Sequence, residues 1–188
     1  MKQEKSYDLE WSETRFSACL IGYMRQIKQQ RGIELRIEPE SYLYQEKILK
    51  GCEDPATAPR IDIKISGSWV HEDIYYGLEA KILVETDWKK RSASYLLNRY
   101  IKTGIGNFVN GRYSHEMSRG CITGYVLQGS TPEIVLKINN ILLQDGRSKE
   151  VIEKSESING CPHYYQSRHI RNTDKKKIEL QHVFLTFV

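Results

Sequence analysis

The sequence predicts an α/β fold in which a mixed central β-sheet is flanked by helices. Apolar residues alternate with polar ones over 61–65, which is typical of a half-buried strand. They recur at helical spacing over 7–30 and 131–144, and such helices between strands permit parallel neighbours. With 39% hydrophobic and 28% charged residues, the chain is expected to form one globular domain over 1–188.

The first third of the chain predicts a helix, a strand and a less regular segment. The helix covers 7–30, and Gly32 is its expected C-cap. Residues 33–37 alternate as in a strand, which the following proline is expected to close. Residues 40–50 suit a short helix, and the composition of 51–59 is that of a loop.

The central feature is a pair of strands predicted at 61–66 and 74–84, joined by a turn and paired antiparallel. Residues two apart on a strand point to the same face, so Glu79 and Lys81 share a face. If the strands pair, Asp62 comes alongside them. Charges seldom enter so apolar a strand unless they are paired or bind a metal ion.

The rest of the chain predicts further helices and strands of the same layered fold. A helix is expected at 87–102, a glycine-rich turn at 104–114 and a third apolar strand at 120–128. Thr131 is the expected cap of the helix over 131–144. The remaining expectations are a polar connection over 147–160 and a final hairpin of 164–170 and 178–188. The predicted acids are expected at one edge of the sheet.

Two carboxylates and an ammonium group at the end of a hairpin suggest phosphate chemistry. Carboxylate oxygens are hard ligands that suit Mg²⁺, which keeps waters and phosphate oxygens in its shell. A lysine beside such an ion can orient or deprotonate an attacking water. The structural alternative is that Glu79 and Lys81 form a same-face ion pair that contributes little to stability.

In this order of elements the chain resembles the PD-(D/E)XK nuclease superfamily. The resemblance covers roughly Asp8 to Thr131: a helix, then Asp62 on one strand, then Glu79-x-Lys81 on the next, then a helix and a strand. The Pro-Asp dipeptide of the family is absent, because Ile61 precedes the aspartate. The resemblance implies a restriction-endonuclease-like core.

Carried over by position, the resemblance also implies a set of site residues. The catalytic residues would be Asp62, Glu79, Lys81 and Glu13. The metal would be Mg²⁺, with Mn²⁺ as a substitute, held by Asp62, Glu79 and the backbone carbonyl of Ala80. Lys81 would act on the attacking water. The sequence leaves the assisting glutamate open between Glu13 and Glu10, with Glu40 and Glu46 as outside candidates.

The activity that the resemblance implies is metal-dependent hydrolysis of DNA phosphodiester bonds, in restriction or anti-phage defence. A net charge of +4 is compatible with DNA but is weak evidence for it. Cations in and after the basic helix are expected to contact phosphates: Lys89, Lys90, Arg91, Arg99, Lys102 and Arg112. The chain shows no separate recognition domain, so a homodimer or a larger complex with a specificity subunit is expected.

Two other function classes remain open at this stage. One is a catalytically inactive nuclease-fold module that binds DNA or a partner protein, against which the intact triplet argues. The other is an enzyme that uses a single acid–lysine pair, such as a lyase, although the sequence has no further motif for it.

The cellular location expected from the sequence is the cytoplasm, with no membrane partner. The start of the chain has no secretory pattern, and no apolar segment approaches the length that spans a bilayer. The four cysteines are far apart in sequence and form no CxxC pair, so reduced thiols are expected.

Overall fold

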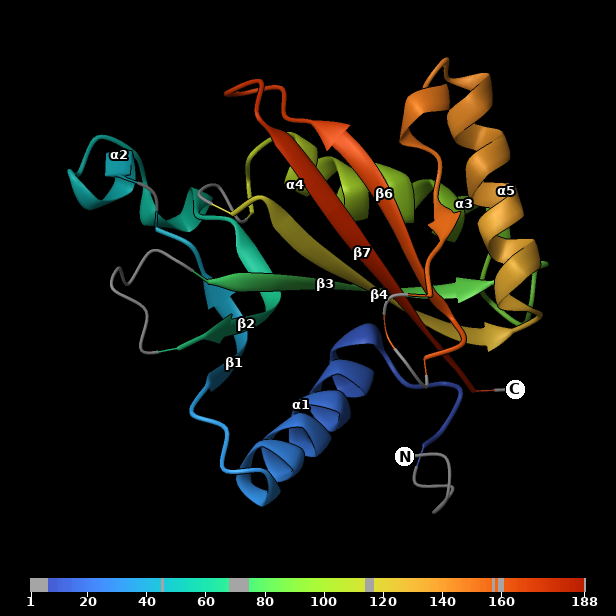
Figure 1. Ribbon diagram of the computed structural model, residues 1–188, viewed down its shortest axis with the longest axis horizontal. Coiled ribbons are helices and arrows are strands. Elements are labelled where there is room, and N and C mark those ends of the chain that lie inside the picture. The colour runs from blue at the N-terminus through green and yellow to red at the C-terminus, as the bar shows by residue number, and fades with distance from the viewer. Residues whose placement is uncertain are drawn as a thin grey trace.

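The computed structural model describes residues 7–44, 46–67, 75–113, 117–156, 158 and 161–187 (Figure 1). Its strands are β1 (Arg36–Tyr42), β2 (Arg60–Ser66), β3 (Tyr76–Val84), β4 (Arg119–Gln128), β5 (Glu153–Lys154), β6 (Tyr164–Ile170) and β7 (Lys177–Thr186). Its helices are α1 (Glu13–Gln30), α2 (Glu46–Leu49), η2 (Pro55–Thr57), α3 (Ala93–Arg99), η3 (Tyr100–Ile105), α4 (Gly106–Val109), α5 (Thr131–Gln144) and η4 (Ser148–Glu150).

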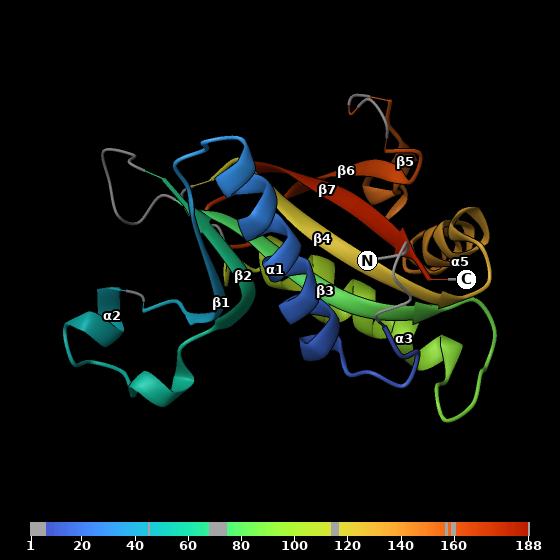
Figure 2. The same ribbon diagram turned by 90° about the horizontal axis from the view of Figure 1, so that it is seen from below.

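The described strands form one mixed sheet in the order β1-β2-β3-β4-β7-β6-β5. The strands β1, β2 and β3 pair antiparallel, whereas β3 pairs parallel with β4 and β4 parallel with β7. Helix α1 lies across one face of the sheet, and α3, η3, α4 and α5 lie on the other (Figure 2). The predicted α/β fold with a mixed central sheet is therefore confirmed.

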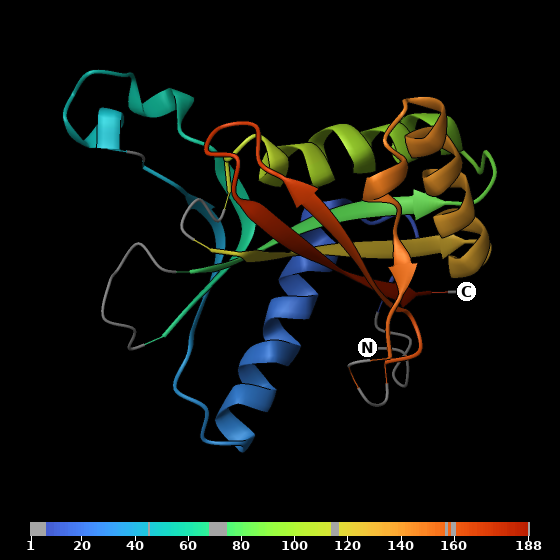
Figure 3. The ribbon, with the colours of Figure 1, turned by 45° about the horizontal axis from the view of Figure 1, so that its top comes forward.

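The sheet opens between β2 and β3, and this opening positions the site. Their registered pairs are Ile63–Leu78, Lys64–Gly77 and Ile65–Tyr76. Towards the start of β2 the two strands separate (Figure 3). Asp62 and Glu79 therefore lie just past the last registered pair, between the second and third strands of the sheet. The expectation that the acids lie at the edge of the sheet was wrong.

Two hydrophobic layers hold the helices on the sheet. On the α1 face, the buried Phe16 and Ile21 pack against β3 and the strands beside it. On the other face, α5 buries Ile134, Ile138 and Leu142 against the sheet and α3. Among the described residues, no helix is both long enough and apolar enough to cross a lipid bilayer.

The first helix and strand begin later than the sequence pattern suggested. Helix α1 starts at Glu13, because the Ser12 side chain accepts a hydrogen bond from the Arg15 backbone amide. The C-cap of α1 is Arg31 and not the predicted Gly32, which follows it with φ of 62°. Strand β1 contains Pro39 instead of ending before it, and an edge strand tolerates a proline that would interrupt a central one.

The helix expected at 87–102 begins and ends later in the structure. Ser92 caps it, and the backbone amide of Ala93 donates to Asp87 Oδ1 at 2.8 Å. The helix then continues without a break through the π-helical η3 into α4. The turn expected from residue 104 therefore starts only near Gly111, whose φ of 68° ends the helical run.

The C-terminal third agrees closely with the expectation. Helix α5 covers the predicted range, although its cap is Ser130 and not Thr131. The connection over 147–160 contains η4 and β5, and the expected final hairpin is formed by β6 and β7.

For the second central strand, the described part begins at residue 75, so its predicted start at 74 lies outside the described residues.

Candidate functional site

The carboxylates of Asp62 and Glu13 occupy the opening between β2 and β3. Beyond the last registered pair, the backbone amides of Ala80 and Ile82 no longer face a paired strand. Asp62 Oδ2 accepts the hydrogen bond of the Ala80 amide at 2.7 Å, and Glu13 Oε2 that of the Ile82 amide at 3.0 Å. These two carboxylates replace the carbonyl groups of the missing strand partner, as buried amides require.

Glu79 and Lys81 lie on the adjacent face of β3 and are almost completely buried, at 5% and 2% exposure. The Lys81 ammonium donates to Glu79 Oε1 and, at 2.8 Å, to the backbone carbonyl of Ala80. Its Nζ also lies 3.8 Å from Glu13 Oε1. Helix η3 covers the lysine stem closely, because a Cβ on Gly104 would lie 3.8 Å from Lys81 Cγ.

The site is acidic and poorly solvated. Burial raises the pKa of Glu79 to about 7, although the nearby Lys81 opposes this shift. Burial also raises the pKa of Asp62, against the effects of the Ala80 amide and of Lys81. Among the residues that the structure describes, the three carboxylates of Asp62, Glu79 and Glu13 face two cations, Lys81 and Arg99. Full ionisation therefore leaves the site one positive charge short.

The donor chemistry of the site fits a hard divalent cation. Glu79 Oε2 is buried and has no hydrogen-bond partner among the described residues. Two further oxygens beside it, Glu79 Oε1 and the backbone carbonyl of Ala80, both accept hydrogen bonds from the Lys81 ammonium. Oxygen donors of this type suit Mg²⁺. The described residues contain no group of three His, Cys, Asp or Glu side chains arranged to hold a metal ion.

The structure brings Glu13, and not Glu10, into the site. Glu13 accepts two hydrogen bonds from the Arg99 guanidinium, at 3.0 and 2.8 Å, besides that of the Ile82 amide. Glu10 instead pairs with Lys89 at the surface. The two outside candidates pair elsewhere, Glu40 with Arg60 at 3.7 Å and Glu46 with Lys50 at 2.5 Å.

Replacing Glu13 by alanine is expected to destabilise the fold by about 1–3 kcal/mol, because it leaves the Ile82 amide without an acceptor. The Glu13 side chain is only 15% exposed. The matched control is Glu10→Ala, which removes a pair between side chains that are 57% and 46% exposed. That change should cost about 1 kcal/mol or less. Urea denaturation measures both, and equal losses would contradict the role given to Glu13.

The predicted DNA-contacting cations do not lie along one helix, because residues 89–91 precede α3 and Arg112 follows α4. Lys89 pairs with Glu10, and its ammonium lies 4.6 Å from the centre of the neighbouring indole ring. Arg91 donates to the Trp11 carbonyl at 3.2 Å, and Arg99 is held inside the site by its glutamate. Exposed side chains are found at the other three positions, Lys90, Lys102 and Arg112. These three have the accessibility that phosphate contacts require.

Tyr113 belongs to the site, although the sequence predicted only a glycine-rich turn over 104–114. It is 5% exposed, and its hydroxyl donates to the Arg60 carbonyl at 2.8 Å and accepts from Asn107 Nδ2 at 3.1 Å. Burial raises its pKa, and the carboxylates of Glu79 and Asp62 raise it further. No local sequence pattern predicts the burial of Tyr113, because the acceptor of its hydroxyl, the Arg60 carbonyl, lies on β2, distant in the sequence.

The two histidines of the final hairpin, His169 and His182, belong to a chain of hydrogen bonds. His182 Nδ1 bonds Tyr100 Oη at 2.7 Å and its Nε2 bonds Ser167 Oγ at 2.8 Å. Ser167 Oγ also bonds His169 Nε2 at 2.6 Å, and His169 Nδ1 bonds Glu150 at 2.6 Å. Burial lowers the pKa of His182 to about 3, so its ring stays neutral. All four ring nitrogens have protein partners, so we assign this chain of hydrogen bonds a structural role.

Comparison of the chain with protein-family models, with curated proteins and with solved structures gives no match. None of them identifies a PD-(D/E)XK nuclease. The described residues offer three carboxylates, a buried lysine and a buried carboxylate oxygen without a donor, gathered at an opening in the sheet.

Proposed function

We propose that this protein is a metal-dependent nuclease that hydrolyses phosphodiester bonds of DNA. The observation that supports this most directly is the buried Glu79 Oε2, which has no donor among the described residues and lies in a site short of positive charge. A buried carboxylate oxygen without a donor is uncommon, and a bound cation, a bound water or a catalytic role accounts for most such groups. The PD-(D/E)XK resemblance of the sequence supports the same activity.

In the proposed mechanism, Asp62, Glu79 and the Ala80 carbonyl would hold Mg²⁺, or Mn²⁺ in its place. When bound, the ion supplies positive charge at the phosphoryl oxygens. Lys81 orients the attacking water at Nζ, and it would accept the proton of that water there as the neutral amine, after its ammonium proton has passed to solvent. Glu13 and Arg99 hold each other beside the lysine, so that its ammonium is surrounded by groups of fixed position.

The exposed Lys90, Lys102 and Arg112 are the proposed phosphate contacts, which grip the backbone without reading sequence. We further propose a cytoplasmic role in restriction or anti-phage defence. All four cysteines are free thiols, which suits a reducing compartment. A second copy of the chain or a specificity subunit would supply target recognition.

The test is a cleavage panel with single-stranded, duplex and branched DNA, and with RNA, each incubated with Mg²⁺, Mn²⁺ or EDTA. We expect cleavage of DNA with either metal and none with EDTA, because the proposed chemistry needs the ion. Products are resolved on denaturing gels. Cleavage that persists in EDTA, or a complete lack of cleavage with both metals, would contradict the proposal.

A second candidate is a nuclease-fold module that binds DNA or a partner protein without cutting. The observation in its favour is that Asp62 and Glu13 already satisfy the backbone amides of β3, so both have a structural reason to be present. Binding of DNA by the wild type, with no cleavage of any substrate in the same panel, would favour this candidate.

A further inference from the structure

Two tyrosines beside the site expose their rings to solvent. Tyr42 is 53% exposed and Tyr44 is 51% exposed, although large aromatic side chains are usually well buried. Their rings are nearly parallel, with an interplanar angle of 9° and centroids 6.4 Å apart. They define an aromatic platform, by which we mean these two rings, on the last residue of β1 and two residues beyond it, ahead of α2.

The backbone fixes the platform close to the proposed catalytic residues. Tyr42 is paired directly with Arg60 across β1 and β2, and Arg60 lies two residues, roughly 7 Å, from Asp62 along the strand. The Arg60 carbonyl is also the acceptor of the Tyr113 hydroxyl. The intervening Leu43 is buried, and its amide donates to the carbonyl of residue 59 at 2.8 Å. The platform is therefore anchored from below while its rings remain open.

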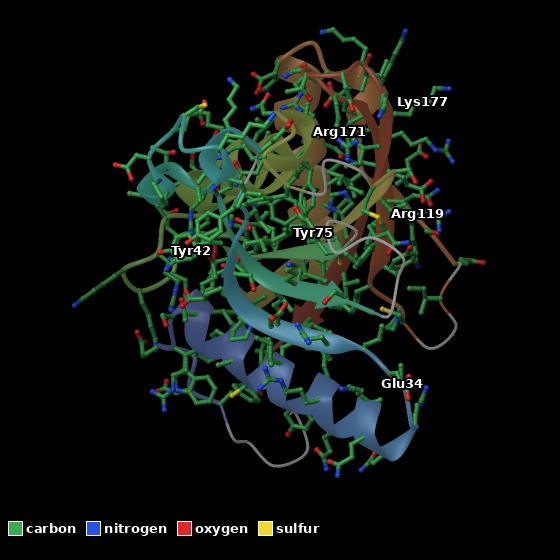
Figure 4. The ribbon with its side chains drawn as sticks, turned by 90° about the vertical axis from the view of Figure 1, so that its left-hand side faces the viewer. Glu34, Tyr42, Tyr75, Arg119, Arg171 and Lys177 are labelled. Carbon is green, nitrogen blue, oxygen red and sulfur yellow. The ribbon has the colours of Figure 1, made fainter. Side chains whose placement is uncertain are left out.

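Strand β1 has an unusual backbone conformation two residues before Tyr42. Glu40 adopts φ of 42°, in the left-handed region that residues other than glycine rarely enter. Its carboxylate pairs with the Arg60 guanidinium at 3.7 Å. The pairing of β1 with β2 continues past Glu40 to Tyr42, and Figure 4 shows this tyrosine on the same side of the molecule as Tyr75, the residue that precedes β3.

We propose that Tyr42 and Tyr44 stack on unpaired bases of the DNA strand that the site cuts, so that the substrate is single-stranded. This inference depends on the proposed nuclease function and names its substrate class. Aromatic side chains bind single strands by base stacking, which tolerates any sequence because every base has a π-face. Bases inside a duplex are already stacked on each other and cannot use the rings. Arg60 adds a cation beside the platform for the adjoining phosphate.

The experiment measures binding in EDTA, where no metal-dependent cleavage occurs. A fluorescein-labelled oligodeoxynucleotide is used as a single strand and, annealed to its complement, as a duplex. Fluorescence anisotropy then gives the dissociation constants for the wild type, Tyr42→Ala, Tyr44→Ala and Tyr42→Phe. The control is Leu49→Ala, an apolar side chain on α2 that is 71% exposed but has no ring.

Each alanine variant is expected to bind the single strand about tenfold more weakly, whereas Tyr42→Phe and Leu49→Ala bind like the wild type. Duplex binding should be unchanged in all four. Unchanged single-strand binding by both alanine variants, or equal weakening for strand and duplex, would overturn the inference. Binding is measured without metal, so a failure of the stacking inference is seen as unchanged single-strand binding by the two alanine variants. A failure of the proposed nuclease function is seen separately, as a lack of cleavage with Mg²⁺ and Mn²⁺.

Discussion

Replacing Lys81 by methionine is expected to lower the rate of Mg²⁺-dependent DNA cleavage by about 10²- to 10⁴-fold, the usual contribution of a positioned acid or base. Methionine is chosen because the lysine stem packs under η3, and its unbranched side chain keeps most of that contact. DNA binding should be retained, since the buried ammonium is not among the exposed cations. Single-turnover cleavage and anisotropy in EDTA measure the two quantities separately.

Two controls decide whether such a loss is chemical. Lys176→Ala removes a lysine that is 64% exposed on the β6–β7 turn and should cleave like the wild type. Thermal unfolding of Lys81→Met shows whether the variant is folded. Its fold should persist, because burial already raises the pKa of Glu79 to about 7 and the unpaired carboxyl can take up a proton. Cleavage at the wild-type rate by folded Lys81→Met would remove Lys81 from the mechanism.

The central sheet was predictable because its strands carry strong local patterns. The alternation over 61–65 and the apolar run ending at Val84 each specify a strand without reference to the rest of the chain. Pro39 and Gly104 were misjudged for a tertiary reason. The first lies on an edge strand, where a proline is tolerated, and the second lies in a helix that packs against the sheet.

The candidate site was predictable in its residue types but not in its contacts. The spacing of Glu79 and Lys81 on one strand fixes their common face, and the structure pairs them as that spacing requires. The role of Glu13 depends instead on β2 leaving β3, which exposes the Ile82 amide. No local pattern encodes that separation. The burial of Tyr113 and the exposure of Tyr42 depend on the same tertiary arrangement.

Replacing Glu79 by leucine alone is expected to destabilise the protein by roughly 3–5 kcal/mol, because it leaves the Lys81 ammonium buried without its closest partner. The double variant Glu79→Leu/Lys81→Met should recover this loss and reach at least the stability of the wild type. Apolar residues that replace a buried ion pair are often neutral, or stabilising by about 1–4 kcal/mol. Urea denaturation at neutral pH measures the free energy of unfolding for all three proteins.

This comparison separates a functional pair from a structural one. A pair retained for stability would make the double variant less stable than the wild type, and such a result would contradict a catalytic reason for burying these charges. Removing the exposed pair Glu46–Lys50 in the same way should change stability by about 0.5 kcal/mol or less, since both groups remain in water. Recovery in the double variant, together with its loss of cleavage, would mean that the chain tolerates a costly buried pair for its chemistry, as active sites commonly do.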